Sequence, residues 1–224
     1  MSPPLRVVDP ARPSVHSRFP RTATAIIAAI TAIVSLAISV TGAEQNAAVL
    51  LGFIPARLSG TLELLPAIPA LLTPLSATLV HGGALHLAAN LILLLWCGRA
   101  VEQIIGPGSL VLLYVIGGFI AAAAQFLVAP HSIIPMIGAS GAISALVGAF
   151  AYSYGRPKRL VQSPPLNRAL NIAWLLAAWI VIQLLVGFVA GQQGMLLATP
   201  AHIGGFLAGV ALQRPLLLWR YRRA

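Results

Sequence analysis

The chain has 224 residues, of which 58% are hydrophobic and only 8% are charged, and its mean hydropathy is +0.91. A soluble globular domain carries about 25% charged residues, so this composition excludes a soluble fold and predicts an integral membrane protein. The formal net charge of +10 would suit nucleic-acid binding. However, the basic residues lie between or outside the apolar segments rather than on one face, so we expect no nucleic-acid partner.

The N-terminal part combines a basic tail with a first apolar segment. Residues 1–21 are polar and proline-rich and carry four arginines, and we expect them to be a disordered tail. The apolar segment from Thr22 to Gly42 is long enough to span, since a bilayer needs about 20 residues. A cleaved signal peptide is the alternative, but its apolar region has only about 7–15 residues. We therefore interpret residues 22–42 as an uncleaved first transmembrane helix.

Residues 43–80 are apolar but interrupted. Pro55, Pro66, Pro69 and Pro74 prevent one continuous helix here. Unpaired backbone groups are costly in hydrocarbon, so a lipid-facing span is excluded. The pattern indicates a structured loop that lies partly in the membrane interface.

The rest of the chain contains five further apolar segments that are typical of helices. We expect these helices at about 84–105, 109–128, 140–154, 169–190 and 201–219. The predicted fold class is therefore all-α, a polytopic bundle of six transmembrane helices. Its expected organisation is a cytoplasmic tail at 1–21, a membrane domain at 22–219 and a basic cytoplasmic C-terminus at 220–224.

The charges of the connecting segments predict the orientation. Successive connecting segments lie on alternate sides of the membrane. One side therefore holds the N-terminal tail, the 99–108 and 155–168 segments and the C-terminus. This side holds every lysine and arginine except Arg57 and Arg214. Arg214 lies near the end of its helix, so its long side chain can extend to the same side. By the positive-inside rule, both termini are cytoplasmic. Arginine outnumbers lysine and alanine is abundant, which suggests a GC-rich bacterial genome, so we expect the protein in a bacterial inner membrane.

Two polar residues in separate apolar helices indicate a reaction centre. Ser140 lies about 15 residues from the cytoplasmic end of its helix, or roughly 22 Å, and His202 lies about 17 residues away, or roughly 25 Å. Both therefore lie at similar depth in a hydrocarbon core of about 30 Å. A histidine next to a serine can act as its general base. The alternative is that Ser140 only serves helix packing, which is common in membranes.

Neighbouring residues support a close approach of these helices and a site for an anion. Small residues recur every four positions in both helices, which allows their backbones to pack closely. They are Gly141, Ala145 and Ala149 in the first helix and Ala201, Gly205 and Gly209 in the second. His86 and Asn90 share one helix face and can donate hydrogen bonds to an oxyanion; interhelical bonding is the alternative. The histidines have no accompanying carboxylate or thiol and no H-E-x-x-H motif, so we expect neither a metal nor another cofactor.

Four motifs occur in order along the chain: His81-Gly-Gly-Ala-Leu-His86-Leu-Ala-Ala-Asn90, Gly98-Arg99-Ala100-Val101-Glu102 with Gly106, Gly138-Ala-Ser140-Gly141, and Ala201-His202-Ile-Gly-Gly205 with Gly209. Together they resemble those of a known family, the rhomboid intramembrane serine proteases, and the resemblance covers about residues 50–213. The resemblance implies Ser140 as nucleophile, His202 as general base, and His86 and Asn90 as oxyanion donors. It also implies structural roles near the site for five other residues, His81, Gly138, Gly141, Gly205 and Gly209.

The resemblance implies transmembrane proteins as substrates and the lipid bilayer as the working environment. Two features depart from some family members: residues 43–80 contain no tryptophan, and Ser144 stands where an aromatic residue would stack on the histidine. A catalytically silent rhomboid-like binder of membrane proteins is one alternative, although such relatives usually lack the serine or the histidine. A transporter is another, but it would place ionisable residues along a path through the membrane.

Overall fold

The computed structural model describes residues 22–154, 159, 161–191 and 198–222, so the predicted tail at 1–21 lies outside the described residues. Within these residues the regular structure is helical, joined by turns and loops, and one isolated backbone bridge pairs Phe53 with Met136. The α-helices are α1 (Ala23–Val40), α2 (Glu44–Leu51), α3 (Pro55–Leu58), α4 (Thr73–Ser76), α5 (Ala84–Leu93), α6 (Arg99–Ile105), α7 (Pro107–Val128), α8 (Ser140–Tyr154), α9 (Pro164–Gly191) and α10 (Thr199–Tyr221). A π-helical turn at Leu94–Gly98 joins α5 to α6.

Five of the described helical segments are long and apolar enough to cross a membrane. They are α1, the continuous segment Ala84–Ile105, α7, the Pro164–Leu185 part of α9, and α10. The all-α polytopic membrane fold is thereby confirmed. α8 has only 15 residues, or roughly 22 Å at the usual rise per residue. The count of six transmembrane helices stays a prediction, because α8 is shorter than a full span.

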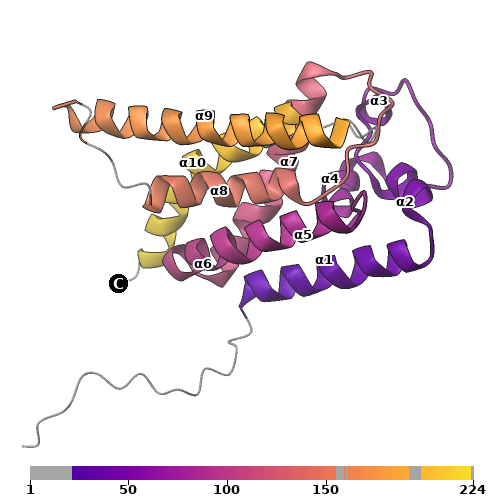
Figure 1. The fold of residues 1–224 in the computed structure, drawn as a ribbon, viewed down its shortest axis with the longest axis horizontal. Coiled ribbons are helices and arrows are strands. Elements are labelled where there is room, and N and C mark those ends of the chain that lie inside the picture. Colours follow the sequence, from indigo (N-terminus) through magenta and orange to yellow (C-terminus); the bar gives the residue numbers. More distant parts are fainter. Residues whose placement is uncertain (1–21, 155–158, 160, 192–197, 223–224) are drawn as a thin grey trace, which may run out of the picture.

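The short helix α8 lies at the centre of the bundle. It contacts α7, α10, α5 and α9, and Figure 1 shows it between α5 and α9. Its residues Ala142, Ala145 and Ala149 are at most 1% exposed, although a lipid-facing helix would expose its apolar side chains. A helix that is apolar all round belongs in a core. α8 is therefore enclosed by protein, and it begins with Ser140.

Glycines bring α10 against α8 backbone to backbone. A Cβ atom added at Gly205 would overlap the carbonyl oxygen of Gly141, and one at Gly209 would overlap that of Ala145. From the other side, a Cβ atom at Gly148 would overlap the carbonyl oxygen of Phe206. Small residues at such contacts allow membrane helices to approach closely. The register of α10 on α8 is thus fixed by three places where any side chain would collide with backbone.

A buried carboxylate fixes the first helix to the bundle. The Glu102 carboxylate accepts hydrogen bonds from the backbone N–H groups of Ala23, at 2.8 Å, and Thr24, at 3.0 Å. It also accepts one from the Thr24 hydroxyl, at 2.5 Å. The first N–H groups of a helix lack partners within the helix, and its N-terminus favours negative charge. Glu102 therefore caps α1 from a helix 78 residues further along the chain.

The segment between α1 and α5 folds into short helices and turns at one end of the bundle (Figure 1). Phe53 and Met136 exchange two backbone hydrogen bonds, of 3.0 Å and 2.8 Å, and the N–H of Gly138 donates to the carbonyl oxygen of Ala77 at 2.9 Å. These bonds join the loop to the strand-like segment that leads into α8. The loop thus supports the residues that directly precede Ser140.

Replacing Gly209 by alanine tests the close contact between α8 and α10. Alanine normally favours a helix over glycine by about 0.8–1 kcal/mol. Here its Cβ would overlap the backbone of Ala145, so we expect a net loss of about 1–3 kcal/mol of stability from overpacking. The measurement is the thermal midpoint of the purified protein in detergent. The control is Gly108→Ala in α7, where an added Cβ meets nothing within 4 Å. A Gly209→Ala midpoint equal to or higher than that of wild type, as expected for Gly108→Ala, would contradict the contact.

Candidate active site

Ser140 begins α8 directly after an unusual backbone segment. Gly138 has a φ of +105°, which side chains other than glycine rarely adopt. A Cβ atom there would lie 2.7 Å from Nε2 of His86 and 3.8 Å from Oγ of Ser140. Glycine at 138 therefore leaves open a space that the His86 ring and the Ser140 hydroxyl both border.

The Ser140 hydroxyl and the His202 ring form a hydrogen bond between α8 and α10. Ser140 Oγ lies 2.7 Å from His202 Nε2, the usual length for a hydroxyl donating to a ring nitrogen. His202 is buried, and among the described residues no side chain or backbone group bonds its Nδ1. The structure thus shows a serine and a histidine in hydrogen-bond contact with no described carboxylate behind the histidine, which differs from the arrangement of a Ser-His-Asp triad.

His86 faces the same space, whereas Asn90 lies one turn further into the bundle. The backbone N–H of Gly82 donates to Nδ1 of His86 at 3.3 Å, so in the neutral ring the proton resides on Nε2. Nε2–H is therefore directed toward the space next to Gly138. The buried Asn90 donates from Nδ2 to the backbone oxygen of His86 at 2.9 Å. Asn90 thus uses one amide N–H to bond the turn that carries His86. The second amide N–H takes no part in that bond.

His81 connects α1 to the backbone immediately before Ser140. The Ser35 hydroxyl donates to the carbonyl oxygen of Leu79 and lies 2.8 Å from Nδ1 of His81. Because that hydroxyl proton is used, His81 donates from Nδ1–H, and its Nε2 accepts the N–H of Ala139 over 3.4 Å. His81 lies in the connection between the spanning segments Ala23–Val40 and Ala84–Ile105, outside both. Burial, with a smaller contribution from His86, lowers its pKa to about 3. It therefore stays neutral, as acceptance at Nε2 requires.

Ser144 occupies the position at which an aromatic residue would stack on His202. Its hydroxyl donates to the carbonyl oxygen of Ser140 at 2.7 Å, one turn back along α8. Ser144 is fully buried, and a Cβ atom added at Gly205 would lie only 3.1 Å from the Cβ atom of Ser144. A small residue at 144 therefore allows α10 to approach α8, and no ring can stack on His202 from this position.

Ser140, His202 and His86 border one cavity of about 950 Å³. Gly138 and Gly141 line it as well, while His81 lies behind the Ala139 backbone and Gly205 and Gly209 lie at the α8–α10 contact. Most of the remaining wall is apolar and includes Met136 and Ile137 from the segment before α8. A cavity with apolar walls and a few convergent polar groups is typical of a ligand site.

Two polar contributors were missed by the sequence reasoning. Ser35 supports His81 from α1, and Gln125 of α7 lines the cavity with a buried Oε1 that has no hydrogen-bond partner among the described residues. A signal for Ser35 existed, since Thr24, Thr31 and Ser35 recur at helical spacing on an apolar helix and are all buried. Gln125 stands alone in its helix, and no pattern marked it.

Comparison with known proteins agrees with these motifs. Residues 70–219 match the family model described as the Rhomboid domain, which covers more than half of the chain. The chain belongs to the rhomboid family. The matched range contains Ser140 and His202 as well as His81, His86 and Asn90.

Several rhomboid relatives match about two thirds of the chain. It is 33% identical to the rhomboid protease GluP of Bacillus subtilis over 146 residues, which are 65% of this chain and 26% of that protein. It is 34% identical to RHOMBOID-like protein 5 of Arabidopsis thaliana over 144 residues, 64% of this chain and 43% of that protein. It is 31% identical to the rhomboid protease GlpG of Klebsiella pneumoniae over 142 residues, 61% of this chain and 45% of that protein. The chain thus spans less than half the length of each relative.

Replacing His81 by phenylalanine tests its role in this rhomboid. The variant leaves the buried N–H of Ala139 without its acceptor, which costs about 1–3 kcal/mol of stability. Between the unfolded pKa of about 6.5 and the folded pKa of about 3, the unfolded chain binds more protons at His81. Stability from His81 is therefore complete above about pH 6.5 and decreases as the pH falls below it.

The measurement is the thermal midpoint in detergent at about pH 7 and about pH 5. We expect the wild-type midpoint to fall on acidification and the fall to be smaller in His81→Phe. The control is His131→Phe, which changes an exposed histidine and keeps the wild-type fall. An identical fall in wild type and His81→Phe would refute the assignment.

Proposed function

We propose that this chain is an intramembrane serine endopeptidase that cleaves transmembrane segments of membrane proteins. The observation that carries the proposal is the 2.7 Å contact between Ser140 Oγ and His202 Nε2, which joins two helices inside the cavity. Such a pair has a nucleophile and a base within hydrogen-bond reach, which is the requirement for covalent catalysis at serine. Membership of the rhomboid family and the named rhomboid proteases among the relatives support the same activity.

In the proposed acylation step, Ser140 Oγ attacks the carbonyl carbon of the scissile peptide bond. His202 Nε2 takes the hydroxyl proton as the new C–O bond forms, and the carbonyl oxygen becomes an oxyanion. The imidazolium then donates that proton to the leaving amine as the C–N bond breaks. General acid–base help of this kind accelerates a reaction by about 10²–10⁴-fold. Water later attacks the acyl-enzyme by the same route and releases the second product.

The oxyanion would lie next to Gly138, within reach of several donors. Nε2–H of His86 borders this space, and the proposed second donor is the other amide N–H of Asn90, one helical turn along α5. The N-terminus of α8 adds backbone N–H groups and a favourable dipole at Ser140. Removal of one oxyanion donor typically costs about 2.7–4 kcal/mol of transition-state stabilisation.

The proposed orientation places both termini in the cytoplasm of a bacterial cell, with the protein in the inner membrane. The Ser140 end of α8 then faces the opposite side, where α2–α4 gather (Figure 1). The charge distribution supports this orientation, because Arg57 alone among the basic residues belongs to the loops on the Ser140 side. Substrate segments and water would thus approach the dyad from the non-cytoplasmic side.

Cleavage of a reporter transmembrane protein in liposomes tests the proposed dyad. We expect product from wild type and a loss of at least about 10³-fold in kcat/KM for Ser140→Ala and for His202→Ala, because dyad members act as a unit. The matched controls are Ser132→Ala, a second serine of the same cavity, and His131→Ala, an exposed histidine. Both should retain activity within about threefold.

Equal activity of Ser140→Ala and wild type would place the nucleophile elsewhere. A different outcome is a folded wild type that binds the reporter segment but cuts neither it nor other rhomboid substrates. That outcome would support a silent binder of membrane proteins instead.

The oxyanion assignment predicts a kinetic signature for His86. His86→Ala should lower kcat by about 10²–10³-fold with little change in KM, because the donor acts on charge that develops only in the transition state. Asn90→Ala should lower kcat less, since Asn90 first bonds the His86 carbonyl. The measurement is the rate of reporter cleavage against substrate fraction in the bilayer. An unchanged kcat in His86→Ala would exclude His86 as a donor.

A further inference from the structure

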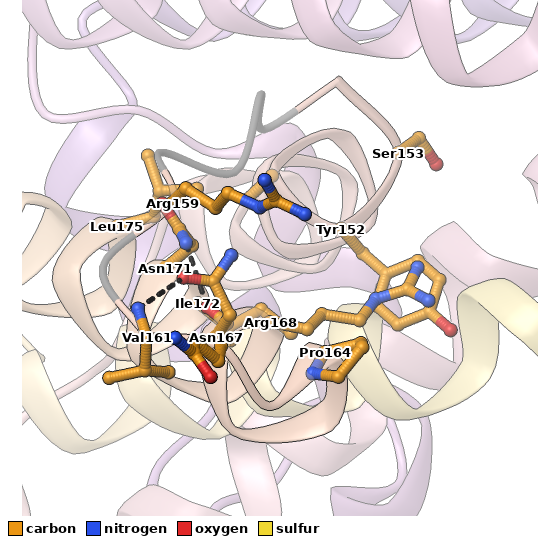
Figure 2. A pocket seen from close by; sticks show the side chains of 12 residues that line it. Tyr152, Ser153, Arg159, Val161, Pro164, Asn167, Arg168, Asn171, Ile172 and Leu175 are labelled. Atoms are coloured by element: carbon orange, nitrogen blue, oxygen red, sulfur yellow. Dashed lines mark hydrogen bonds between the residues drawn. The ribbon is translucent and has the colours of Figure 1, made fainter.

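A second cavity, of about 660 Å³, lies at the opposite end of α8 from Ser140. Its described walls come from the end of α8, the start of α9 and the segment between them (Figure 2). Tyr152 is 12 residues beyond Ser140, so the two cavities are separated by roughly 18 Å along the helix. This cavity therefore belongs to the other boundary of the membrane and is separate from the dyad.

The cavity is basic and has no acidic wall. Arg159 and Arg168 line it, and none of its twelve lining residues carries a carboxylate. The whole chain has only four acidic residues, and one of them, Glu102, is bound to the start of α1. The cavity thus presents two positive charges without a neutralising group in its wall, which favours an anionic ligand.

Side chains around the two arginines are held in place. The Arg168 guanidinium lies 3.9 Å from the centroid of the Tyr152 ring, and Figure 2 shows it lying over that ring. The backbone N–H of Val161 donates to Asn167 Oδ1 at 3.3 Å, and Asn171 Nδ2 donates to the Asn167 carbonyl at 2.7 Å. Cation–π contact and these bonds position the polar wall before any ligand arrives, which lowers the entropic cost of binding.

Apolar side chains lie both in the cavity and on the exposed face of α9, the helix that supplies Arg168. Ala151, Ile172 and Leu175 line the cavity itself. On the outer face of α9, Leu166, Leu170 and Trp174 are exposed and recur every four residues, so they form a stripe along one helix face. A ligand that fills both regions needs an anionic group at one end and hydrocarbon at the other.

We propose that this cavity binds the phosphate headgroup of an anionic phospholipid, with the acyl chains along the stripe of α9. Arginine suits this role because its planar guanidinium donates two parallel hydrogen bonds to phosphate oxygens. Basic pockets between helices at the cytoplasmic boundary commonly take such headgroups. A soluble phosphate ester shares the headgroup chemistry, but it would leave the apolar stripe without a contact. The site is independent of cleavage by Ser140.

Native mass spectrometry of the full chain in detergent measures this binding directly. The protein is titrated with phosphatidylglycerol, with phosphatidylcholine and with soluble glycerol phosphate. The test variant is Arg159→Ala with Arg168→Ala, both exposed residues. The matched control is Arg214→Ala with Arg222→Ala, which removes the same charge from exposed residues on α10 and at its end that do not line the cavity. Equal thermal midpoints of the variants establish that both are folded.

We expect wild type to bind phosphatidylglycerol more tightly than phosphatidylcholine, and the test variant to lose about thirtyfold in that affinity. The control variant should lose less than about threefold. An equal loss in both variants would overturn the site in favour of general charge attraction. Displacement of the lipid by glycerol phosphate at matching concentration would overturn the lipid as occupant, and an absence of preference for the anionic lipid in wild type would overturn the proposal as a whole.

Discussion

The contact between the backbones of α8 and α10 is the constraint on which the arrangement of polar groups depends. Ser140 and His202 bond at 2.7 Å because Gly205 and Gly209 let α10 lie on the carbonyl groups of α8. A helix pair in lipid gains no hydrophobic driving force from association, so close packing and interhelical hydrogen bonds must hold it together. Small residues on both helices supply the packing, and the dyad adds a polar bond at its end.

A second set of contacts fixes the chain just before Ser140. The Phe53–Met136 bridge, the Gly138–Ala77 bond and the His81–Ala139 bond all act within five residues of the serine. Phe53 and Ala77 belong to the loop at 43–80, and His81, which follows that loop, is itself bonded to Ser35 of α1. Glu102 in turn fixes the start of α1. Functional groups are most accurately placed when surrounding residues hold them, and here the supporting bonds come from three separate parts of the chain.

Hydropathy and charge allowed the all-α membrane fold and most helix positions to be predicted, because a bilayer permits few arrangements of an apolar chain. Helix 84–105 agrees with the sequence expectation, whereas α9 starts five residues earlier than expected, at Pro164. Proline is well tolerated in the first turn of a helix, which the sequence reasoning did not use. The meeting of Ser140, His202 and His86 was expected from depth and motif. The Ser35–His81–Ala139 chain was not, since a tautomer and its partners depend on tertiary contacts.

We propose that His202 activates Ser140 as a nucleophile. Covalent labelling of the full chain in liposomes by a fluorophosphonate, followed by peptide mass spectrometry, tests it most directly because no substrate need be known. We expect modification at Ser140 and not at Ser132 or Ser144, with labelling reduced by at least about 10³-fold in His202→Ala. Labelling of Ser140 that is equally fast without His202, or no labelling of a folded wild type, would contradict it.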